Sequence, residues 1–155
     1  MKKILIALDY NPTAKKVAEE GYSIAKAMKA QVILLHVLGD STYYTTTDYS
    51  SIMGFNGLGL WQLLDSTEVL KEKAQKFLDK SKYHLGDETI KTMITEGKFA
   101  ESILKAAEDT HASIIVMGSH SRRWLESIIL GSVTEKVLNQ TNIPVFIVPT
   151  KKEGN

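Results

Sequence analysis

The first 37 residues alternate between two short apolar runs and one amphipathic stretch. Residues 3–8 form a nearly continuous apolar run, and residues 31–37 form a second. Between them, apolar side chains recur at helical spacing over residues 12–29, and Asn11 followed by Pro12 is typical of a helix start. A strand, a helix and a strand joined by such short links form a right-handed crossover between parallel strands. The opening therefore predicts a parallel sheet covered by helices.

The rest of the chain repeats this alternation. Gly86 and Gly97 interrupt it where elements are expected to end, and the prolines at 144 and 149 suit an edge strand, which can spare backbone donors. The expected elements are helices over residues 61–83, over 99–109 and from 132, and strands over 89–96, 114–117 and 143–149. The pattern predicts an α/β single-domain three-layer sandwich over residues 1–150, with a five-stranded parallel sheet and helices on both faces, and a polar tail at 151–155.

The composition limits the classes of function. The chain has 155 residues, which suits one domain, and its formal net charge of +1 offers no field to attract nucleic acid or an acidic membrane. No apolar run is long enough to span a bilayer, and residues 1–9 lack the apolar length and cleavage site of a signal peptide. There is no cysteine, which excludes thiolate nucleophiles and thiolate metal sites. We expect a cytoplasmic protein with no nucleic-acid or membrane partner.

Residues 113–133 carry the pattern with the most chemical content. A buried strand over residues 114–117 ends at Gly118, where the lack of a Cβ would let a ligand approach the backbone. Ser132 is predicted as the N-cap of the next helix, with Glu135 as its capping-box partner, and a helix N-terminus favours anions. A phosphate chain could be held between the two turns. On the glycines alone, an ordinary capped loop with nothing bound is the better interpretation.

The spacing within this stretch resembles the nucleotide-binding signature of the universal stress protein family, Gly-x2-Gly-x9-Gly-Ser/Thr. The matching positions are Gly118, Ser121, Gly131 and Ser132. Ser121 departs from the signature: a serine keeps the backbone N–H and adds a hydroxyl, but its Cβ fits poorly where a loop needs a positive φ. The resemblance covers nearly the whole chain. It implies a UspA-like domain of the adenine nucleotide alpha hydrolase-like fold, with strand order 3-2-1-4-5.

The resemblance also implies an ATP crevice at the carboxyl ends of the first and fourth strands, where open α/β sheets bind ligands. In the family, an aspartate in the place of Asp9 contacts the nucleoside end of ATP, and the backbone of a valine in the place of Val37 meets the adenine. The residues alone leave open whether Asp9 contacts a ligand or only caps a turn. The nucleotide-binding residues expected here are Ala7, Leu8, Asp9, Val37, Met117, Gly118, His120, Ser121, Arg122, Gly131, Ser132 and Val133.

His120 and Arg122 have ordinary interpretations as well, because a lone loop histidine and a loop arginine also fit exposed positions. No acid or second histidine is spaced to make His120 catalytic. We therefore predict no catalytic residue and at most slow ATP hydrolysis. The expected site offers few carboxylates, so Mg2+ would be held mainly by the phosphates rather than by protein metal ligands.

Two functions of different classes remain open. The first is a nucleotide-binding stress-response switch that acts through dimer or partner contacts. The second is a dimeric adaptor that binds no nucleotide, since some branches of the family lack a complete signature. An adenylating enzyme is disfavoured, because such enzymes typically carry a glycine-serine-rich loop after the first strand, where this chain has residues 9–12.

Two stretches could serve contacts with partners. In the family the last strand pairs with its copy in a second subunit, which implies a homodimer through the edge strand at residues 144–149. Residues 39–60 form a long connection without a clear period, which is typical of a functional segment or of a poorly ordered loop. The aromatic side chains there could cover the ligand crevice or meet a partner, and an ordinary surface loop is an equal alternative.

Overall fold

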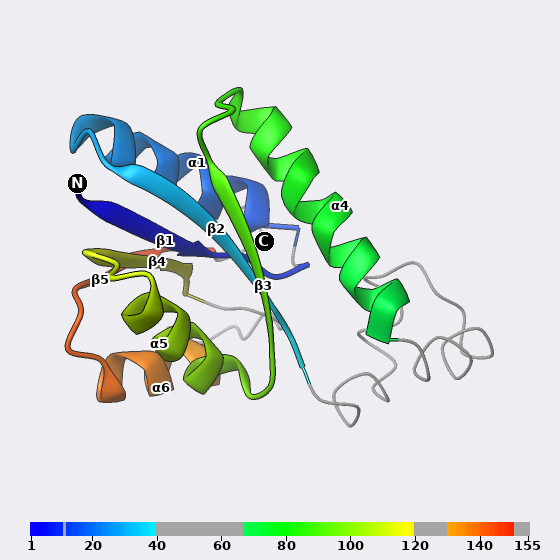
Figure 1. Ribbon diagram of the computed structural model, residues 1–155. Helices are drawn as coiled ribbons and strands as arrows, with labels where there is room; N and C mark the ends of the chain where they lie inside the picture. Colours follow the sequence, from blue (N-terminus) through cyan, green and yellow to red (C-terminus); the bar gives the residue numbers. More distant parts are fainter. Residues whose placement is uncertain (11, 40–66, 120–129, 151–155) are drawn as a thin grey trace, which may run out of the picture.

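The computed structural model describes residues 1–10, 12–39, 67–119 and 130–150. In this part of the chain strands and helices alternate, as the periodicity predicted (Figure 1). The elements are β1 (Lys3–Ala7), α1 (Ala14–Ala27), β2 (Gln31–Leu38), α4 (Thr67–Leu85), β3 (Lys91–Glu96), α5 (Phe99–Asp109), β4 (Ile114–Gly118), α6 (Ser132–Gln140) and β5 (Val145–Val148). The expectations for residues 40–60, for a helix start at residues 61–66 and for the tail at 151–155 lie outside the described residues.

All five strands are parallel and lie in the order β3-β2-β1-β4-β5, which confirms the predicted topology. β1 is central: Ile4 pairs with Val32 of β2 on one side and with Ile114 of β4 on the other. From β1 the chain adds β2 and β3 in one direction, and β4 and β5 lie in the other. The carboxyl ends of β1 and β4 therefore meet at a topological switch point, the usual ligand position in such sheets.

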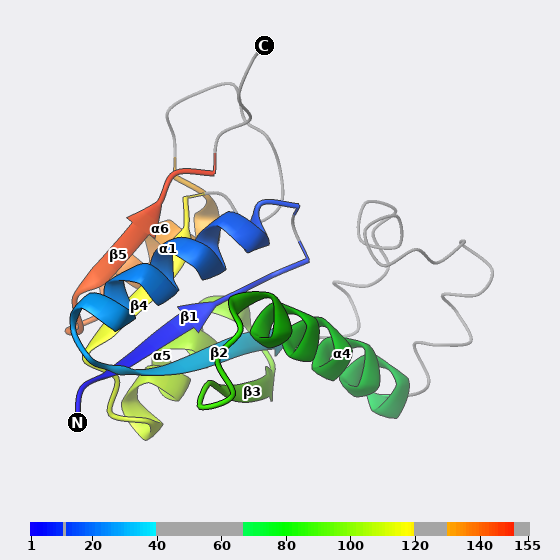
Figure 2. The same cartoon turned by 90° about the horizontal axis from the view of Figure 1, so that it is seen from above.

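Helices cover both faces of the sheet. α1 and α4 pack on one face, and α5 and α6 lie together on the other (Figure 1, Figure 2). Ile4 and Ile6 of β1 belong to the core beneath α1, whereas Leu5 belongs to the core beneath α5 and α6. All three side chains are 0% exposed. Burial on both faces explains why the run over residues 3–8 is continuously apolar rather than alternating.

Gly21 lets α1 approach the sheet closely. A Cβ built on Gly21 would lie 2.7 Å from Ile6 Cδ1 and 3.2 Å from Val116 Cγ1. A larger residue would need these core side chains to shift. The close approach holds α1 against β1 and β4, and it brings the first turn of the helix to the carboxyl ends of both strands.

One helix start and one helix cap differ from the prediction. α1 begins at Ala14 with Thr13 as N-cap, so Pro12 lies in the preceding turn; Asn11 is outside the described residues. α6 has Gly131 as its N-cap and Ser132 as its first helical residue, and no side chain caps it, so the capping box expected from Ser132 and Glu135 is wrong. The reason is that Gly131 N–H donates to Ser119 O at 2.7 Å, which holds Gly131 extended and lets the helix begin directly after it.

The turns on either side of β3 follow the glycines, as expected. Gly86 ends α4 with φ +69°, and Gly97 ends β3 with φ +124°, a backbone region that favours glycine. β3 begins at Lys91 rather than at residue 89, because Asp87 Oδ1 accepts hydrogen bonds from both the amide and the hydroxyl of Thr89. This Asx-type turn removes Thr89 from the strand.

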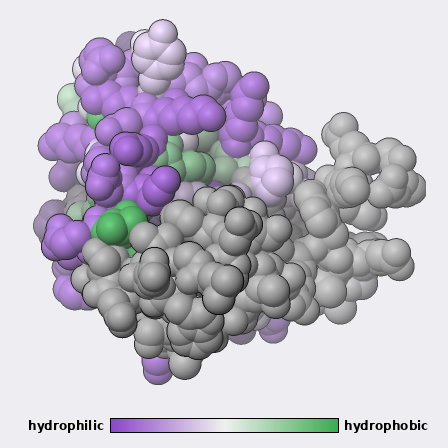
Figure 3. All heavy atoms as spheres, turned by 90° about the vertical axis from the view of Figure 1, so that its right-hand side faces the viewer, coloured by the Kyte–Doolittle hydropathy of each residue, from purple (hydrophilic) through white to green (hydrophobic). Residues whose placement is uncertain are grey.

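β5 and β3 occupy the two edges of the sheet, as the sequence predicted. Pro144 and Pro149 flank β5 and lie outside it, so neither proline interrupts the backbone pairing with β4. Among the helices that the structure describes, none is long and apolar enough to cross a membrane. The described surface on the side of α4 is mostly hydrophilic (Figure 3).

Candidate functional site

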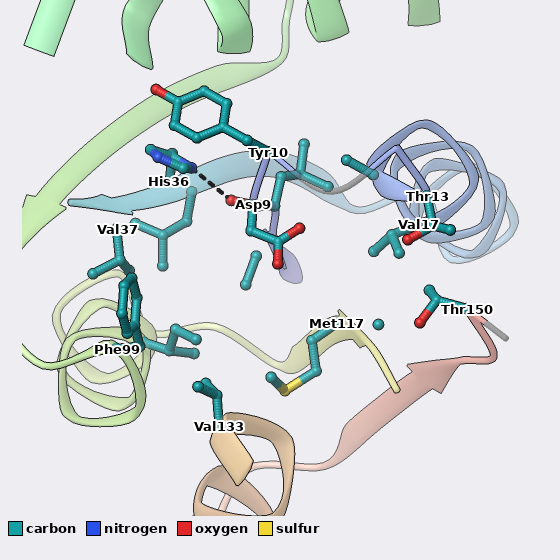
Figure 4. Close-up of a pocket in the computed structure, with 16 residues that line it drawn as sticks. Asp9, Tyr10, Thr13, Val17, His36, Val37, Phe99, Met117, Val133 and Thr150 are labelled. Atoms are coloured by element: carbon teal, nitrogen blue, oxygen red, sulfur yellow. Dashed lines mark hydrogen bonds between the residues drawn. The ribbon is translucent and has the colours of Figure 1, made fainter. Parts of the chain in front are cut away.

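A pocket lies where the carboxyl ends of β1 and β4 meet the first turns of α1, α5 and α6 (Figure 4). Its open space is about 710 Å³, a volume that includes solvent at the mouth. Both faces of the sheet and the segment after β5 contribute to its walls. The lining residues are Ala7, Leu8, Asp9, Tyr10, Thr13, Ala14, Val17, Leu35, His36, Val37, Phe99, Ile103, Met117, Gly118, Val133 and Thr150.

Asp9 follows the last residues of the central strand and stands in the middle of this pocket. Both backbone polar groups of the preceding residue, Leu8, are hydrogen-bonded. Leu8 N–H donates to Leu35 O at 2.8 Å, and Leu8 O accepts from His36 Nδ1 at 2.8 Å. The Asp9 carboxylate points into the space between the walls (Figure 4). A carboxylate in this place can accept hydrogen bonds from hydroxyl groups of a ligand.

One end of the pocket is apolar. Val37 of β2 and Phe99, the first residue of α5, lie side by side on one wall (Figure 4). Met117 of β4 and Val133 of α6 form the adjoining wall, and Ile103, on the same helix as Phe99, also lines the pocket. These side chains offer an apolar surface and one aromatic ring, which suits a flat apolar group of a ligand.

The other end is more polar and more crowded. It is bordered by Thr13 and Val17 at the start of α1, and by Gly118 and Thr150. A Cβ built on Gly118 would lie 2.9 Å from Thr150 Cγ2 and 3.2 Å from Val17 Cγ2. Gly118 is therefore required by packing between its neighbours, in addition to any approach by a ligand.

His36 is a functional candidate that the sequence analysis missed. It is 2% exposed, and because Leu8 O can only accept, His36 Nδ1 must carry the proton. The imidazole packs 4.4 Å from the Tyr10 ring and edge-on to Phe77 at 5.6 Å. Burial lowers the pKa of His36 to about 4, against the opposing effect of the bond to Leu8. The available signal was a single histidine within the apolar run of β2.

The predicted site residues divide into three groups. The pocket brings together seven of them, Ala7, Leu8, Asp9, Val37, Met117, Gly118 and Val133. Gly131 and Ser132 do not line it, but they open α6 beside Val133, and Gly131 is hydrogen-bonded to Ser119. His120, Ser121 and Arg122 lie outside the described residues.

Several lining residues were not expected. No recognisable motif surrounds Tyr10 and Thr13 after β1, or Phe99 and Thr150 in two distant parts of the chain. Thr150 is the least expected: it lies between the last strand and the polar tail at 151–155, yet it is 2% exposed.

Within the described residues, no three histidine, aspartate or glutamate side chains lie close enough together to hold a metal ion. The carboxylate that lines the pocket is that of Asp9. A divalent cation there would need most of its oxygen ligands from a bound molecule or from water.

The fold and the pocket define a class before any comparison is made: a doubly wound α/β domain with a candidate ligand crevice at its switch point. The model of the universal stress protein family matches residues 1–149. The chain therefore belongs to the universal stress protein family. Universal stress protein MJ0577 of Methanocaldococcus jannaschii is 36% identical over 97% of this chain and 96% of that protein. Universal stress protein MJ0531 of the same organism is 34% identical over 98% of this chain and 84% of that protein.

Solved structures agree with this family and fold. The structure of MJ0577 superposes with a TM-score of 0.72 at 32% identity and covers 98% of both chains. Universal stress protein UspA from Lactobacillus plantarum has a TM-score of 0.69 at 22% identity and covers 95% of this chain and 97% of its own. The latter likeness concerns the fold alone.

Proposed function

We propose that this protein binds an adenine nucleotide, with ATP as the principal ligand, in the pocket at the carboxyl ends of β1 and β4. The observation that carries the proposal is the division of this pocket into an apolar end, a central carboxylate and a polar end. A nucleotide has the same three parts in the same order: a flat base, a sugar with hydroxyl groups, and phosphates. The matching signature positions Gly118, Gly131 and Ser132 add support.

In this arrangement the base lies at the apolar end, near the backbone of Val37 and beside Phe99. The Asp9 carboxylate accepts hydrogen bonds from the ribose hydroxyls, as acidic residues do in other doubly wound nucleotide sites. The order of these groups along the pocket leaves the phosphates directed toward Thr150 (Figure 4), which lies beside Gly118. His120, Ser121 and Arg122 complete the phosphate contacts in this proposal.

The start of α6 supplies part of the phosphate site. Gly131 N–H already donates to Ser119 O, so this amide is used within the protein. The amides of Ser132, Val133 and Thr134 have no acceptor within the helix, because they belong to its first turn. They and the positive end of the helix dipole favour the negative charge of phosphate. Ser132 is exposed, so its hydroxyl is accessible to a ligand.

Mg2+ accompanies ATP in this proposal and is held mainly by the phosphate oxygens. The described residues fit this role, since Asp9 stands at the ribose position rather than among several carboxylates. Fast hydrolysis is not expected. His36 uses its protonated Nδ1 to hold Leu8 O, and a general base must be able to reach the reacting group.

The biological role that we propose is a switch in the stress response, in which nucleotide binding alters contacts with a second subunit or a partner. The edge strand β5 offers a surface for a homodimer, since it has a neighbouring strand on one side within this chain and carries Phe146, which is 43% exposed. Dimerisation through residues 144–149 would cover this side chain.

The test is thermal unfolding of the purified protein with ATP and Mg2+, with AMP, with cyclic AMP and without ligand. Cyclic AMP is included because a universal stress protein of similar fold, with a TM-score of 0.61 and 17% identity, was solved in complex with it. A ligand at about a hundred times its Kd adds roughly 2.7 kcal/mol of stability, which raises the melting temperature by several degrees. An Asp9→Asn variant should lose most of the shift. No shift with any of the three at millimolar concentration contradicts the proposal.

One observation favours a second candidate, a dimeric stress adaptor that binds no nucleotide. The packing of Thr150 and Val17 against Gly118 is enough to require glycine there. The first glycine of the signature can therefore be kept for structure alone. In this case the pocket stays empty at millimolar nucleotide, while the dimer persists.

A further inference from the structure

Ser119 connects three parts of the fold at the polar end of the pocket. Its amide donates to Val148 O of β5 at 2.9 Å, and its carbonyl oxygen accepts from Gly131 N–H at 2.7 Å. The second bond brings the two ends of the segment between residues 119 and 131 together. The backbone of Ser119 therefore links the end of β4 to β5 and to the start of α6.

Thr150 holds the side chain of the same serine. Thr150 N–H donates to Ser119 Oγ at 3.0 Å, and the two hydroxyl oxygens lie 3.2 Å apart, with either able to donate to the other. Thr150 is 2% exposed, and its methyl group occupies the space beside Gly118. Thr150 is thus hydrogen-bonded to the residue that also holds Gly131, the N-cap of α6.

A third contact ties α6 to the same place. Thr134 Oγ1, which is fully buried, donates to Gly118 O at 2.9 Å. Gly118 and Ser119 at the end of β4 therefore hold α6 through one side-chain and one backbone hydrogen bond. Movement of Ser119 would be transmitted to the first turn of α6, where the amides have no acceptor within the helix.

We propose that Ser119 and Thr150 form a clasp that positions the polar end of the pocket for the anionic part of the ligand, with Thr150 as a positioning residue. The inference rests on the proposed function for the nature of the ligand. It assigns a role to Thr150, a residue that follows the last strand and lies outside the glycine signature. The clasp acts on the phosphate end and leaves the apolar end, about Val37 and Phe99, unchanged.

The experiment compares binding of ATP and of adenosine, which lacks the phosphates, by calorimetry. Thr150→Val removes the hydroxyl and keeps the shape of the side chain, whereas Thr150→Ser keeps the hydroxyl. We expect Thr150→Val to bind ATP about threefold to tenfold more weakly, as the loss of one hydrogen bond implies, and to bind adenosine as the wild type does. Thr150→Ser should restore ATP binding.

Thr141→Val is the matched control. Thr141 Oγ1 also makes two hydrogen bonds, to the carbonyl oxygen and from the amide of Ile143, but at the far end of α6. Its loss should lower stability and leave the affinities for ATP and adenosine unchanged. An equal loss of ATP and adenosine affinity in Thr150→Val, or no loss of ATP affinity, overturns the proposal.

Amide hydrogen exchange at Gly131 in the ligand-free protein separates failure of the clasp from failure of the proposed function. Thr150→Val should exchange faster there than the wild type and than Thr141→Val, because the acceptor on Ser119 is less firmly held. If the wild type binds neither ATP nor adenosine, the proposed function fails. Faster exchange at Gly131 then still supports the clasp as the element that orders this end of the pocket, and unchanged exchange overturns it.

Discussion

At the scale of single residues, two glycines show how the same residue type serves different physical needs. Gly118 has Thr150 and Val17 where its Cβ would be, and its φ is not in the left-handed region. Gly86 has open space around it but a φ of +69°. The first is a matter of packing and the second a matter of backbone conformation.

Alanine substitution separates the two cases. Gly118→Ala should lower the free energy of unfolding by about 1–3 kcal/mol through overpacking, and it should also weaken ATP binding, because Thr150 must move. Gly86→Ala should cost about 1 kcal/mol through the positive φ and leave binding unchanged. Urea unfolding and calorimetry on both variants provide the measurement. Equal effects on ATP binding would show that Gly118 does not support the site.

His36 makes the stability depend on pH in a predictable direction. Its pKa is 6.5 when unfolded and about 4 in the folded protein, so the unfolded state binds more protons between these values. The contribution of the neutral imidazole is fully present above about pH 6.5 and is lost as the pH falls toward 4. Its full size is roughly 3 kcal/mol, from about 1.4 kcal/mol per pKa unit.

The test compares urea unfolding of the wild type and of His36→Gln at about pH 7.5 and at about pH 4.5. Glutamine can still donate to Leu8 O but does not titrate in this range. The wild type should lose more stability than the variant on acidification. The comparison with the variant separates the titration of His36 from that of the other ionisable groups of the protein. Parallel losses would rule out His36 as the source.

At the scale of elements, α5 shows how one helix start can define the character of the site. α5 spans Phe99–Asp109 as its apolar spacing predicted, with Ile103 and Ala107 buried. The spacing shows which residues face the core. The spacing does not show that Phe99, the first residue of the helix, lies in the pocket at the carboxyl ends of the strands. That position depends on the turn at Gly97.

Phe99 should contribute to binding of the base. Phe99→Ala should weaken adenosine and ATP binding by about the same factor, roughly tenfold, because the aromatic contact is made to the part that the two ligands share. Tyr83→Ala is the control, since Tyr83 is 84% exposed on α4. Calorimetry with both ligands provides the measurement. An unchanged affinity for adenosine would place the base elsewhere in the pocket.

At the scale of the whole molecule, the open edge at β5 is the feature that a second subunit would use. Phe146 is large, apolar and 43% exposed on this strand. Phe146→Lys should convert the proposed dimer to a monomer, because pairing of β5 with its copy would remove water from the lysine ammonium group. Tyr83→Lys introduces the same charge far from β5 and should leave the mass unchanged. Sedimentation equilibrium measures both, and a monomeric wild type would contradict the proposed dimer.

The sequence by itself determined the elements and the topology. Apolar runs, helical spacing and glycines act over a few residues, so they identify β1, α5 and the turns at Gly86 and Gly97 without reference to the rest of the chain. Alternating strands and helices with short links then leave few topologies, and the resemblance to the family selected the order that the structure has.

The tertiary structure alone decided which side chains meet at the pocket. His36 holds Leu8 across 28 residues, and Thr150 holds Ser119 across 31. Neither pair has a local signal, because such hydrogen bonds depend on the register of neighbouring strands and on where the chain turns after β5. Even the start of α6 depends on a bond from Gly131 to Ser119, which explains why the sequence placed its N-cap one residue too late. Local patterns determine elements, whereas contacts between distant residues determine the site.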